Sequence, residues 1–165
     1  MGCVTTMKIT NQKELVKIIS YLAMGDGSVH MNGGSKNHVF SMTQTEEHQD
    51  FLLWVQGVLD NVTSSTLTLT ERSAPRRNIW KLQTRTHPFF NSIRDRIYVN
   101  QYKGIDPHAL KLLDWQAVAL LYMCDGCLGQ SGRSISTTLN LCRLSYGDQL
   151  LLKRALKDAL DLEWN

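Results

Sequence analysis

The 165-residue chain lacks the long apolar runs of membrane proteins and the leader pattern of exported ones. No stretch approaches the roughly 20 consecutive apolar residues that a membrane-spanning helix needs. The first residues have no signal-peptide profile. We therefore expect an intracellular protein, either cytoplasmic (bacterial or phage) or organellar, with no membrane partner.

Cysteine is also scarce, with four residues in the chain, which suits free thiols better than a disulfide framework. Cys124 and Cys127 form a C-x-x-C pair. However, the chain has no second such pair and no nearby histidine pair that would complete a zinc site. A redox or thiolate-metal role is therefore disfavoured.

The chain has no large excess of either charge. Its net charge of +3 permits a nucleic-acid partner without requiring one. The apolar fraction of 42% and the charged fraction of 20% are those of an ordinary globular protein, long enough for one large core or two small fused ones. Five basic residues nevertheless gather in one segment: Arg72, Arg76, Arg77, Lys81 and Arg85.

The most informative feature is a helix end that occurs twice. Two apolar, helix-length runs stop at Asp26-Gly27 and Asp125-Gly126, and the two aspartates lie 99 positions apart. An aspartate at a helix C-terminus is disfavoured by roughly 0.3–1 kcal/mol, and a bound cation would reverse that sign. We expect both glycines to be left-handed C′ residues. One Asp-Gly pair could be a simple turn, but two copies favour one structural unit used twice.

Periodicity predicts the remaining elements. Helical spacing indicates helices at residues 12–26, 46–59, 88–99, 115–124 and 150–160, with a short one starting at Pro107 behind Asp106. Alternation indicates strands at 28–31, 37–44, 63–72, 77–86, 127–130 and 134–143, and the start of another at 161–165. Asn11, Thr45 and Asp114 are predicted N-caps. The 99-residue offset leaves the second half without counterparts of roughly residues 67 to 103.

Two helices ending in Asp-Gly, each followed by a hairpin and a helix, resemble the LAGLIDADG homing endonucleases in their single-chain, two-motif form. The resemblance covers nearly the whole chain. It implies an α+β fold of tandem αββαββα repeats with saddle-shaped antiparallel sheets. The first repeat would span residues 1–99, a linker 100–106, and an incomplete second repeat 107–165. The family packs its motif helices through small residues, for which Ser20 and Ala119 are available.

The resemblance also implies a site-specific endonuclease that cleaves both DNA strands with Mg²⁺ or another divalent cation. Asp26 and Asp125 would be the metal ligands, aided by the carbonyls of Gly25 and Cys124. Oxygen ligands suit such a cation. Three further residues match the family's polar and basic positions around the metals: Gln44, Lys103 and Arg143. The alternatives are that Gln44 is a solvated strand end and Lys103 a surface lysine.

The hairpins would then read double-stranded DNA in the major groove, because a two-stranded ribbon fits there and alternate side chains face the bases or phosphates. The expected contacts on the first hairpin are Ser28, His30, Asn32, Asn37 and Ser41. Those on the second hairpin are Thr68, Thr70, Arg72, Lys81, Gln83 and Arg85, with Arg76 and Arg77 at its tip on phosphates. A solvent-facing sheet would have a similar pattern.

Two other functions fit the same resemblance: an RNA-binding maturase that assists intron splicing, and a DNA-binding module that does not cleave. The incomplete second repeat should also leave apolar surface exposed. A second polypeptide could supply the missing hairpin and helix; alternatively, the sequence is shortened or its second half is reduced.

Overall fold

The computed structural model describes residues 8–131 and 134–163, and their contacts divide into two units. The first unit contains the described residues up to Leu15 together with Gly27–Arg94. The second unit contains Val16–Asp26 and the described residues from Asp95 onward. Among the helices of these residues, none has the length and apolarity needed to cross a membrane.

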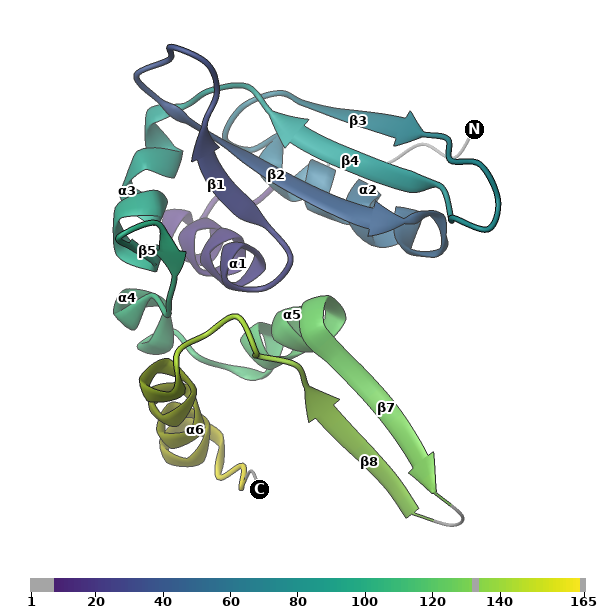
Figure 1. Cartoon of the computed structure of the whole chain (residues 1–165). Helices are drawn as coiled ribbons and strands as arrows, with labels where there is room; N and C mark the ends of the chain where they lie inside the picture. Colours follow the sequence, from purple (N-terminus) through teal and green to yellow (C-terminus); the bar gives the residue numbers. More distant parts are fainter. Residues whose placement is uncertain (1–7, 132–133, 164–165) are drawn as a thin grey trace. The chain divides into compact units, whose positions relative to one another are not determined.

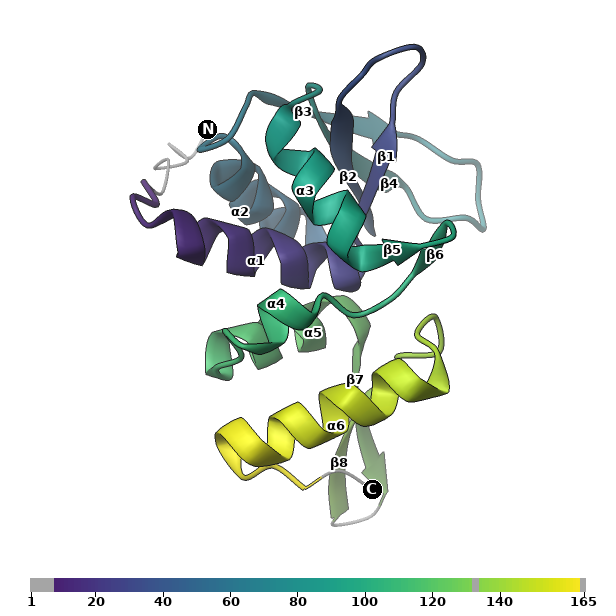
Figure 2. The same ribbon diagram turned by 90° about the vertical axis from the view of Figure 1, so that its left-hand side faces the viewer.

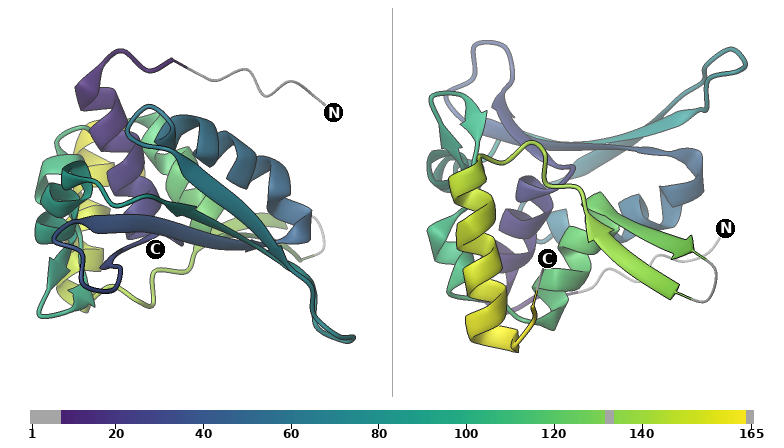
Figure 3. Two further views of the ribbon diagram at one scale, coloured as in Figure 1. Left: turned by 90° about the horizontal axis from the view of Figure 1, so that it is seen from above. Right: turned by 60° about the horizontal axis from the view of Figure 1, so that its bottom comes forward.

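The first unit is built on a four-stranded antiparallel sheet in the order β1-β2-β4-β3 (Figure 1). Its strands are β1 (Ser28–Met31), β2 (His38–Thr45), β3 (Ser65–Thr70) and β4 (Ile79–Thr84). The turn between β1 and β2 passes through Gly33 and Gly34, whose positive φ angles of 23° and 69° favour glycine. Figure 3 shows the β3–β4 loop extending beyond the sheet.

Helix α2 (Gln49–Leu59) covers one face of this sheet. The core face of the helix consists of five buried residues: Phe51, Leu52, Val55, Val58 and Leu59. The predicted cap at Thr45 is wrong: its side chain makes no capping hydrogen bond, and a 3₁₀ turn, η1 (Glu46–His48), precedes the α-helix.

Helix α1 (Gln12–Met24) begins where the Asn11 Oδ1 accepts a 3.0 Å hydrogen bond from the Lys13 backbone N–H. From Val16 onward it belongs to the second unit. Helix α3 (Pro88–Ile97) ends two residues earlier than predicted, because a short hairpin of β5 (Tyr98–Val99) and β6 (Tyr102–Lys103) follows at once. Asn100 and Gln101 form its turn with positive φ angles.

The second unit continues with α4 (Pro107–Leu110), α5 (Trp115–Asp125), β7 (Gly126–Ser131), β8 (Ser134–Leu139) and α6 (Tyr146–Leu160) (Figure 2). The side chains of Asp106, Asp114 and Ser145 cap α4, α5 and α6 by accepting backbone hydrogen bonds. The α+β class with antiparallel sheets is therefore confirmed.

The strands predicted at 63–72 and 77–86 are two residues shorter at each end, as β3 and β4. Two other predicted strands differ for reasons that the hydrogen bonds and backbone angles show. β8 ends at Leu139, not residue 143, because the Asn140 backbone N–H donates to the Asp125 carbonyl and the chain then turns, with Leu144 N–H bonded to Leu141 O. Residues 161–163 form no strand; Asp161 ends α6 in the left-handed region, with φ at 54°. The rest of that predicted strand, residues 164–165, lies outside the described residues.

Candidate active site

The second unit brings the two Asp-Gly helix ends together. A Cβ placed on Gly25 would lie 2.5 Å from Cys124 Cβ and 2.7 Å from Cys124 Sγ, and 3.5 Å from Asp125 Oδ2. The ends of α1 and α5 therefore meet at Gly25 and Cys124, and only a glycine fits at this position on α1. The two predicted metal ligands follow directly: Asp26 after Gly25, and Asp125 after Cys124.

The close approach of the two helices does not use Ser20 and Ala119, the small residues available for it. Ala119 is exposed, and Ser20 is buried against Asp106, to which it donates a 3.1 Å hydrogen bond. Tyr21 turns to α4 instead, where its hydroxyl donates to the Ala109 carbonyl at 3.2 Å. The close approach therefore lies at the last turn of the helices rather than one to two turns earlier.

The prediction that Gly27 and Gly126 adopt the left-handed conformation is wrong. Among the described residues, only Gly33 and Gly34 are glycines with positive φ, and Gly126 has φ −79° and ψ 146°. Gly126 is needed for space: a Cβ there would overlap Tyr122, both its ring and its carbonyl oxygen. α5 accordingly runs through Asp125 straight into β7.

The carboxylates at the helix ends influence each other. Burial, and then the charge of Asp26, raises the pKa of Asp125, while Arg143 and Lys103 oppose that rise. Burial raises the pKa of the Cys124 thiol to about 12, although a hydrogen bond from the Asp26 backbone opposes the shift. Cys124 is therefore a neutral thiol at physiological pH, which agrees with a packing role rather than thiolate chemistry.

Lys103 lies at this site. Its Nζ donates a 2.6 Å hydrogen bond to the carbonyl oxygen of Gly25. Burial and the charge of Arg143 lower the pKa of Lys103, whereas Asp125 and Asp26 raise it. These opposing effects show that two cations and two carboxylates share one electrostatic environment.

Arg143 reaches the site from a loop. It is exposed, it follows the end of β8, and it lines a pocket of about 570 Å³ together with Lys103. The 99-residue offset pairs Arg143 with Gln44, but Gln44 is part of β2 in the first unit. The two residues therefore have different local structures, and the offset does not make them equivalent.

Gln44 lies opposite Trp80 in the β2–β4 pairing, next to the pair of Met42 and Leu82. Met42 and Leu82 are both buried, and α2 packs on the sheet. Gln44 thus shares the apolar face, while its strand neighbour Thr43 is exposed on the other face. Its catalytic role stays a prediction.

The opposite face of the sheet carries the predicted DNA contacts in register. Ser28 pairs with Ser41, Ser41 with Gln83, and Thr68 with Lys81. Because side chains alternate, the same face takes His30 on β1 and Thr66 and Thr70 on β3. The polar-and-basic against apolar alternation expected for the second hairpin is confirmed. We call this surface the polar sheet face.

Several members of the polar sheet face have partners within the first unit. The hydroxyls of Ser28 and Ser41 lie 3.0 Å apart, and the Asn37 Oδ1 accepts from Asn91 at 3.0 Å. Burial and the charge of Lys81 lower the pKa of His30. Lys81 and Arg85 are exposed and line a groove of about 300 Å³ with Thr66, Thr68, Thr70, Gln83 and Thr84. Asn32 is exposed in the adjoining turn.

Acidic residues accompany the arginines at the far end of β3 and β4. Arg77 Nη1 forms a 2.7 Å ion pair with Glu47 Oε2, and Asn78 donates to Glu46. Arg72 and Arg76 are exposed in the same loop, and all of these residues line one open pocket. A phosphate at Arg77 would therefore compete with a carboxylate already in contact.

Exposed apolar side chains concentrate in the second unit, as the incomplete repeat predicts. Trp115, Leu128, Leu150 and Leu151 are 48–64% exposed. Among the described strands β8 pairs only with β7, whereas its counterpart β2 pairs with both β1 and β4. A groove of about 600 Å³ lies between α5 and β8. Figure 3 shows the β7–β8 hairpin projecting from α5.

The donor set at the helix ends consists of two carboxylates with two neighbouring backbone carbonyls, all oxygen ligands of the kind that Mg²⁺ prefers. Within residues 8–131 and 134–163, no group of three or more His, Cys, Asp or Glu side chains is arranged so that it could hold a metal ion. The protein alone would therefore supply few ligands, which suits a cation that also takes ligands from water and from DNA phosphates.

The paired acidic helix ends and the strand-rich surface have a counterpart among known families. The chain matches the model of the LAGLIDADG DNA endonuclease family over residues 16–165. It belongs to that family. A comparison with curated proteins finds no match.

One of the similar solved structures supports the LAGLIDADG fold. The homing endonuclease I-WcaI, bound to its DNA recognition sequence, has a TM-score of 0.73 at 16% identity and covers 96% of this chain and 73% of its own. I-DmoI, in complex with DNA and Mn, has a TM-score of 0.49 at 13% identity, covering 90% of this chain and 78% of its own. At 16% identity the likeness to I-WcaI shows the fold alone.

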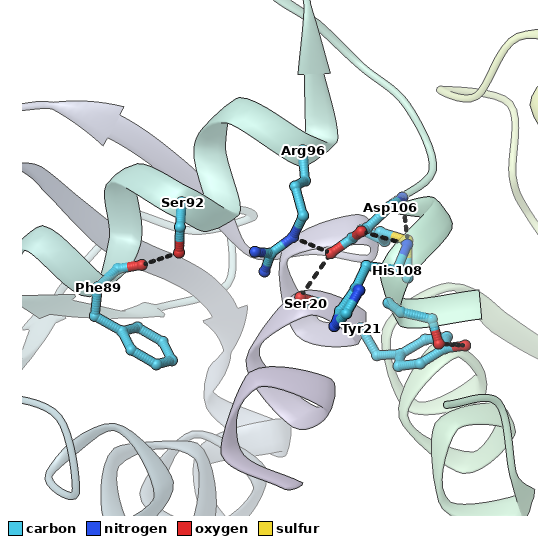
Figure 4. Close-up of polar contacts among 9 residues, drawn as sticks. Ser20, Tyr21, Phe89, Ser92, Arg96, Asp106 and His108 are labelled. Atoms are coloured by element: carbon cyan, nitrogen blue, oxygen red, sulfur yellow. Dashed lines mark hydrogen bonds and ion pairs between the residues drawn. The ribbon is translucent and has the colours of Figure 1, made fainter. Parts of the chain in front are cut away.

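Sequence reasoning missed a buried carboxylate beside this LAGLIDADG site. Asp106 was expected only as the residue before Pro107, yet its side chain has no exposed surface and accepts hydrogen bonds from Ser20, Arg96 and the His108 backbone (Figure 4). Its partners lie as far as 86 positions away in the sequence. Local sequence patterns carry no signal for such a contact.

Proposed function

We propose that this protein is a metal-dependent, site-specific DNA endonuclease that cuts both strands, as in the homing of an intron or intein. The observation that carries the proposal is the meeting of the two Asp-Gly helix ends at Gly25 and Cys124. Two carboxylates in one electrostatic environment are what a two-metal phosphodiester hydrolysis requires. A site with a single carboxylate would at best nick one strand.

In this mechanism Asp26 and Asp125, with the carbonyls of Gly25 and Cys124, would hold divalent cations. Bound there, such ions activate a water and stabilise the leaving 3′ oxygen. Lys103 and Arg143 bring positive charge to the same place and would orient the scissile phosphates. The Lys103 ammonium, held at Gly25 O, would also donate to a phosphate or to the attacking water.

The polar sheet face would read the target in the major groove. Its alternation offers hydroxyl, amide and lysine groups to base edges over four strands. Arg72, Arg76 and Arg85 would contact phosphates and so position the protein rather than specify sequence.

The decisive experiment replaces each aspartate by its amide. Asp26→Asn and Asp125→Asn should each abolish double-strand cleavage of a plasmid carrying a selected site in Mg²⁺, with DNA affinity retained. Asp158→Asn is the matched control, because Asp158 is 69% exposed on α6 and forms a 3.7 Å ion pair with Arg154. Retained double-strand cleavage by both site variants would refute the proposal.

We further infer that a β-hairpin and a helix complete the second unit, supplied either in the same chain or by a second polypeptide. The free edge of β8 and the exposed Leu150 and Leu151 support this inference, since the equivalent edge of β2 binds β4. Sedimentation and dye-binding assays of the 165-residue protein provide the test. A monomer that is fully active and binds no hydrophobic dye would contradict the inference.

A further inference from the structure

Asp106 lies at the base of the β5–β6 hairpin, which carries Lys103. Three contacts join the two sides of this hairpin in order. Arg96 Nε donates to Asp106 Oδ2 at 2.9 Å, Gly104 N–H donates to Ile97 O at 2.7 Å, and Tyr98 pairs with Lys103. The Arg96–Asp106 ion pair therefore closes the hairpin at the end away from its turn.

Asp106 also fastens the hairpin to α1. Ser20 Oγ donates to the same Oδ2 at 3.1 Å, and the Asp106 backbone N–H lies 3.4 Å from the sulfur of Met24. Figure 4 shows the Asp106 carboxylate between Ser20 and Arg96, with the His108 backbone bound to its other oxygen. Ser20 and Met24 precede Gly25 on the helix whose end carries the site.

The consequence concerns the Lys103 ammonium. Lys103 lies three residues before Asp106, and its Nζ reaches the Gly25 carbonyl at 2.6 Å. A lysine side chain has four rotatable bonds and loses considerable freedom when it is held in one place. Fixing both the hairpin and α1 to one buried carboxylate removes the relative motion that would otherwise let this contact open.

We propose that Asp106, with Ser20 and Arg96, is a positioning cluster that holds the Lys103 ammonium at the Gly25 carbonyl, beside the scissile phosphate. This inference rests on the proposed endonuclease function for its catalytic part. Its structural part, the fixed position of Lys103, is independent of any activity. Asp106 itself touches no substrate and is not a catalytic residue.

The first test does not require cleavage. In protein labelled with ¹⁵N-lysine, a held ammonium exchanges its hydrogens slowly and gives a ¹⁵Nζ resonance, which the Lys103→Met variant identifies by its loss. Asp106→Asn and the milder Ser20→Ala should remove or broaden this resonance while the folded backbone spectrum remains. An unchanged Lys103 resonance in both variants would overturn the proposal.

The second test is a double-mutant cycle on the single-turnover cleavage rate. A displacement of about 1 Å at a reacting group costs on the order of 10²-fold in rate. Asp106→Asn and Lys103→Met should each lower the rate by up to that factor with DNA affinity unchanged. The double variant should be no slower than Lys103→Met, because Asp106 acts through Lys103. Multiplied losses would overturn the proposal.

Lys17 and Asp114 provide the matched control. Their 2.6 Å ion pair also fastens α1 within the second unit, with Lys17 7% and Asp114 49% exposed, but the pair lies toward the start of α1. Asp114→Asn should lower the melting temperature yet leave the Lys103 resonance in place. In the double variant with Lys103→Met, the rate losses of the two single variants should multiply. If the wild-type protein cleaves no DNA, the proposed function is refuted. The Lys103 ¹⁵Nζ resonance alone then still tests the positioning cluster.

Discussion

The contact between Gly25 and Cys124 makes one substitution especially informative. Gly25→Ala adds a single methyl group, which would lie 2.5 Å from Cys124 Cβ and 2.7 Å from its sulfur. Carbon atoms in contact prefer about 3.5–4.0 Å. The neighbour is a Cβ fixed to the α5 backbone, so it cannot rotate away. The ends of α1 and α5 must therefore separate by at least about 1 Å.

Two consequences with different magnitudes follow. Overpacking of this kind costs about 1–3 kcal/mol of folding free energy. The displacement also acts on Asp26 and Asp125, which follow directly, and about 1 Å of misplacement costs on the order of 10²-fold in rate. Single-turnover cleavage in saturating Mg²⁺ should therefore fall far more than DNA affinity, measured by fluorescence anisotropy, changes.

Two further variants complete the experiment. Gly57→Ala is a glycine-to-alanine control on α2, where an added Cβ meets nothing within 4 Å, and it should stabilise the protein by about 0.4–1 kcal/mol with unchanged cleavage. Gly25→Ala combined with Cys124→Gly moves the methyl group to the other helix and should recover much of the rate. Wild-type cleavage by Gly25→Ala would refute the idea that this contact sets the aspartate spacing.

Three other predictions concern binding and stability. Lys81→Ala removes an exposed cation between Thr43 and Thr68 on the polar sheet face, and a lost base contact should cost about 1–3 kcal/mol for the selected site but little for random DNA, measured by anisotropy at fixed salt. Glu47→Gln frees Arg77 from its 2.7 Å ion pair, so DNA binding should tighten and its log–log salt slope steepen by about 0.9; an unchanged slope would mean that Arg77 touches no phosphate. Asp125→Asn should raise the melting temperature of the metal-free protein at neutral pH. Its raised folded pKa means that ionised Asp125 opposes folding above that pKa, so the gain should vanish as pH falls through the acidic range, and a gain independent of pH would contradict the assignment.

Local patterns predicted much of this fold. The alternation of Thr68 and Lys81 with Leu67 and Leu82 gave the correct face for these residues, although Ile79 pairs with Thr70 on the polar sheet face. Asp114 was a correct cap because its role depends on the three residues that follow it. Sequence patterns failed where a feature outside the local pattern decides the structure. Thr45 makes no capping hydrogen bond, and a 3₁₀ turn precedes the α-helix. Gly126 is needed because a side chain there would overlap Tyr122, not because of its φ angle.

The residues that meet at the candidate site were named from the sequence: the two aspartates, Gly25, Cys124, Lys103 and Arg143. The Asp-Gly repeat located Asp26 and Asp125, and the family resemblance located Lys103. The close approach at Gly25 and Cys124 could not be derived, because helix periodicity gives a face but not the point along it where two helices meet. Asp106 could not be derived either, since the buried environment of a carboxylate depends on segments far away in the chain.

The sequence distances within the second unit have a consequence for synthesis of the protein. Lys17 bonds to Asp114, 97 positions later, and Gly25 to Lys103, 78 positions later. The sheet of the first unit, in contrast, is complete by Thr84. A nascent chain emerging from the ribosome therefore possesses the residues of the polar sheet face before Lys17 and Gly25 have these two partners. The order of translation places the sheet of the first unit ahead of the site at the two helix ends.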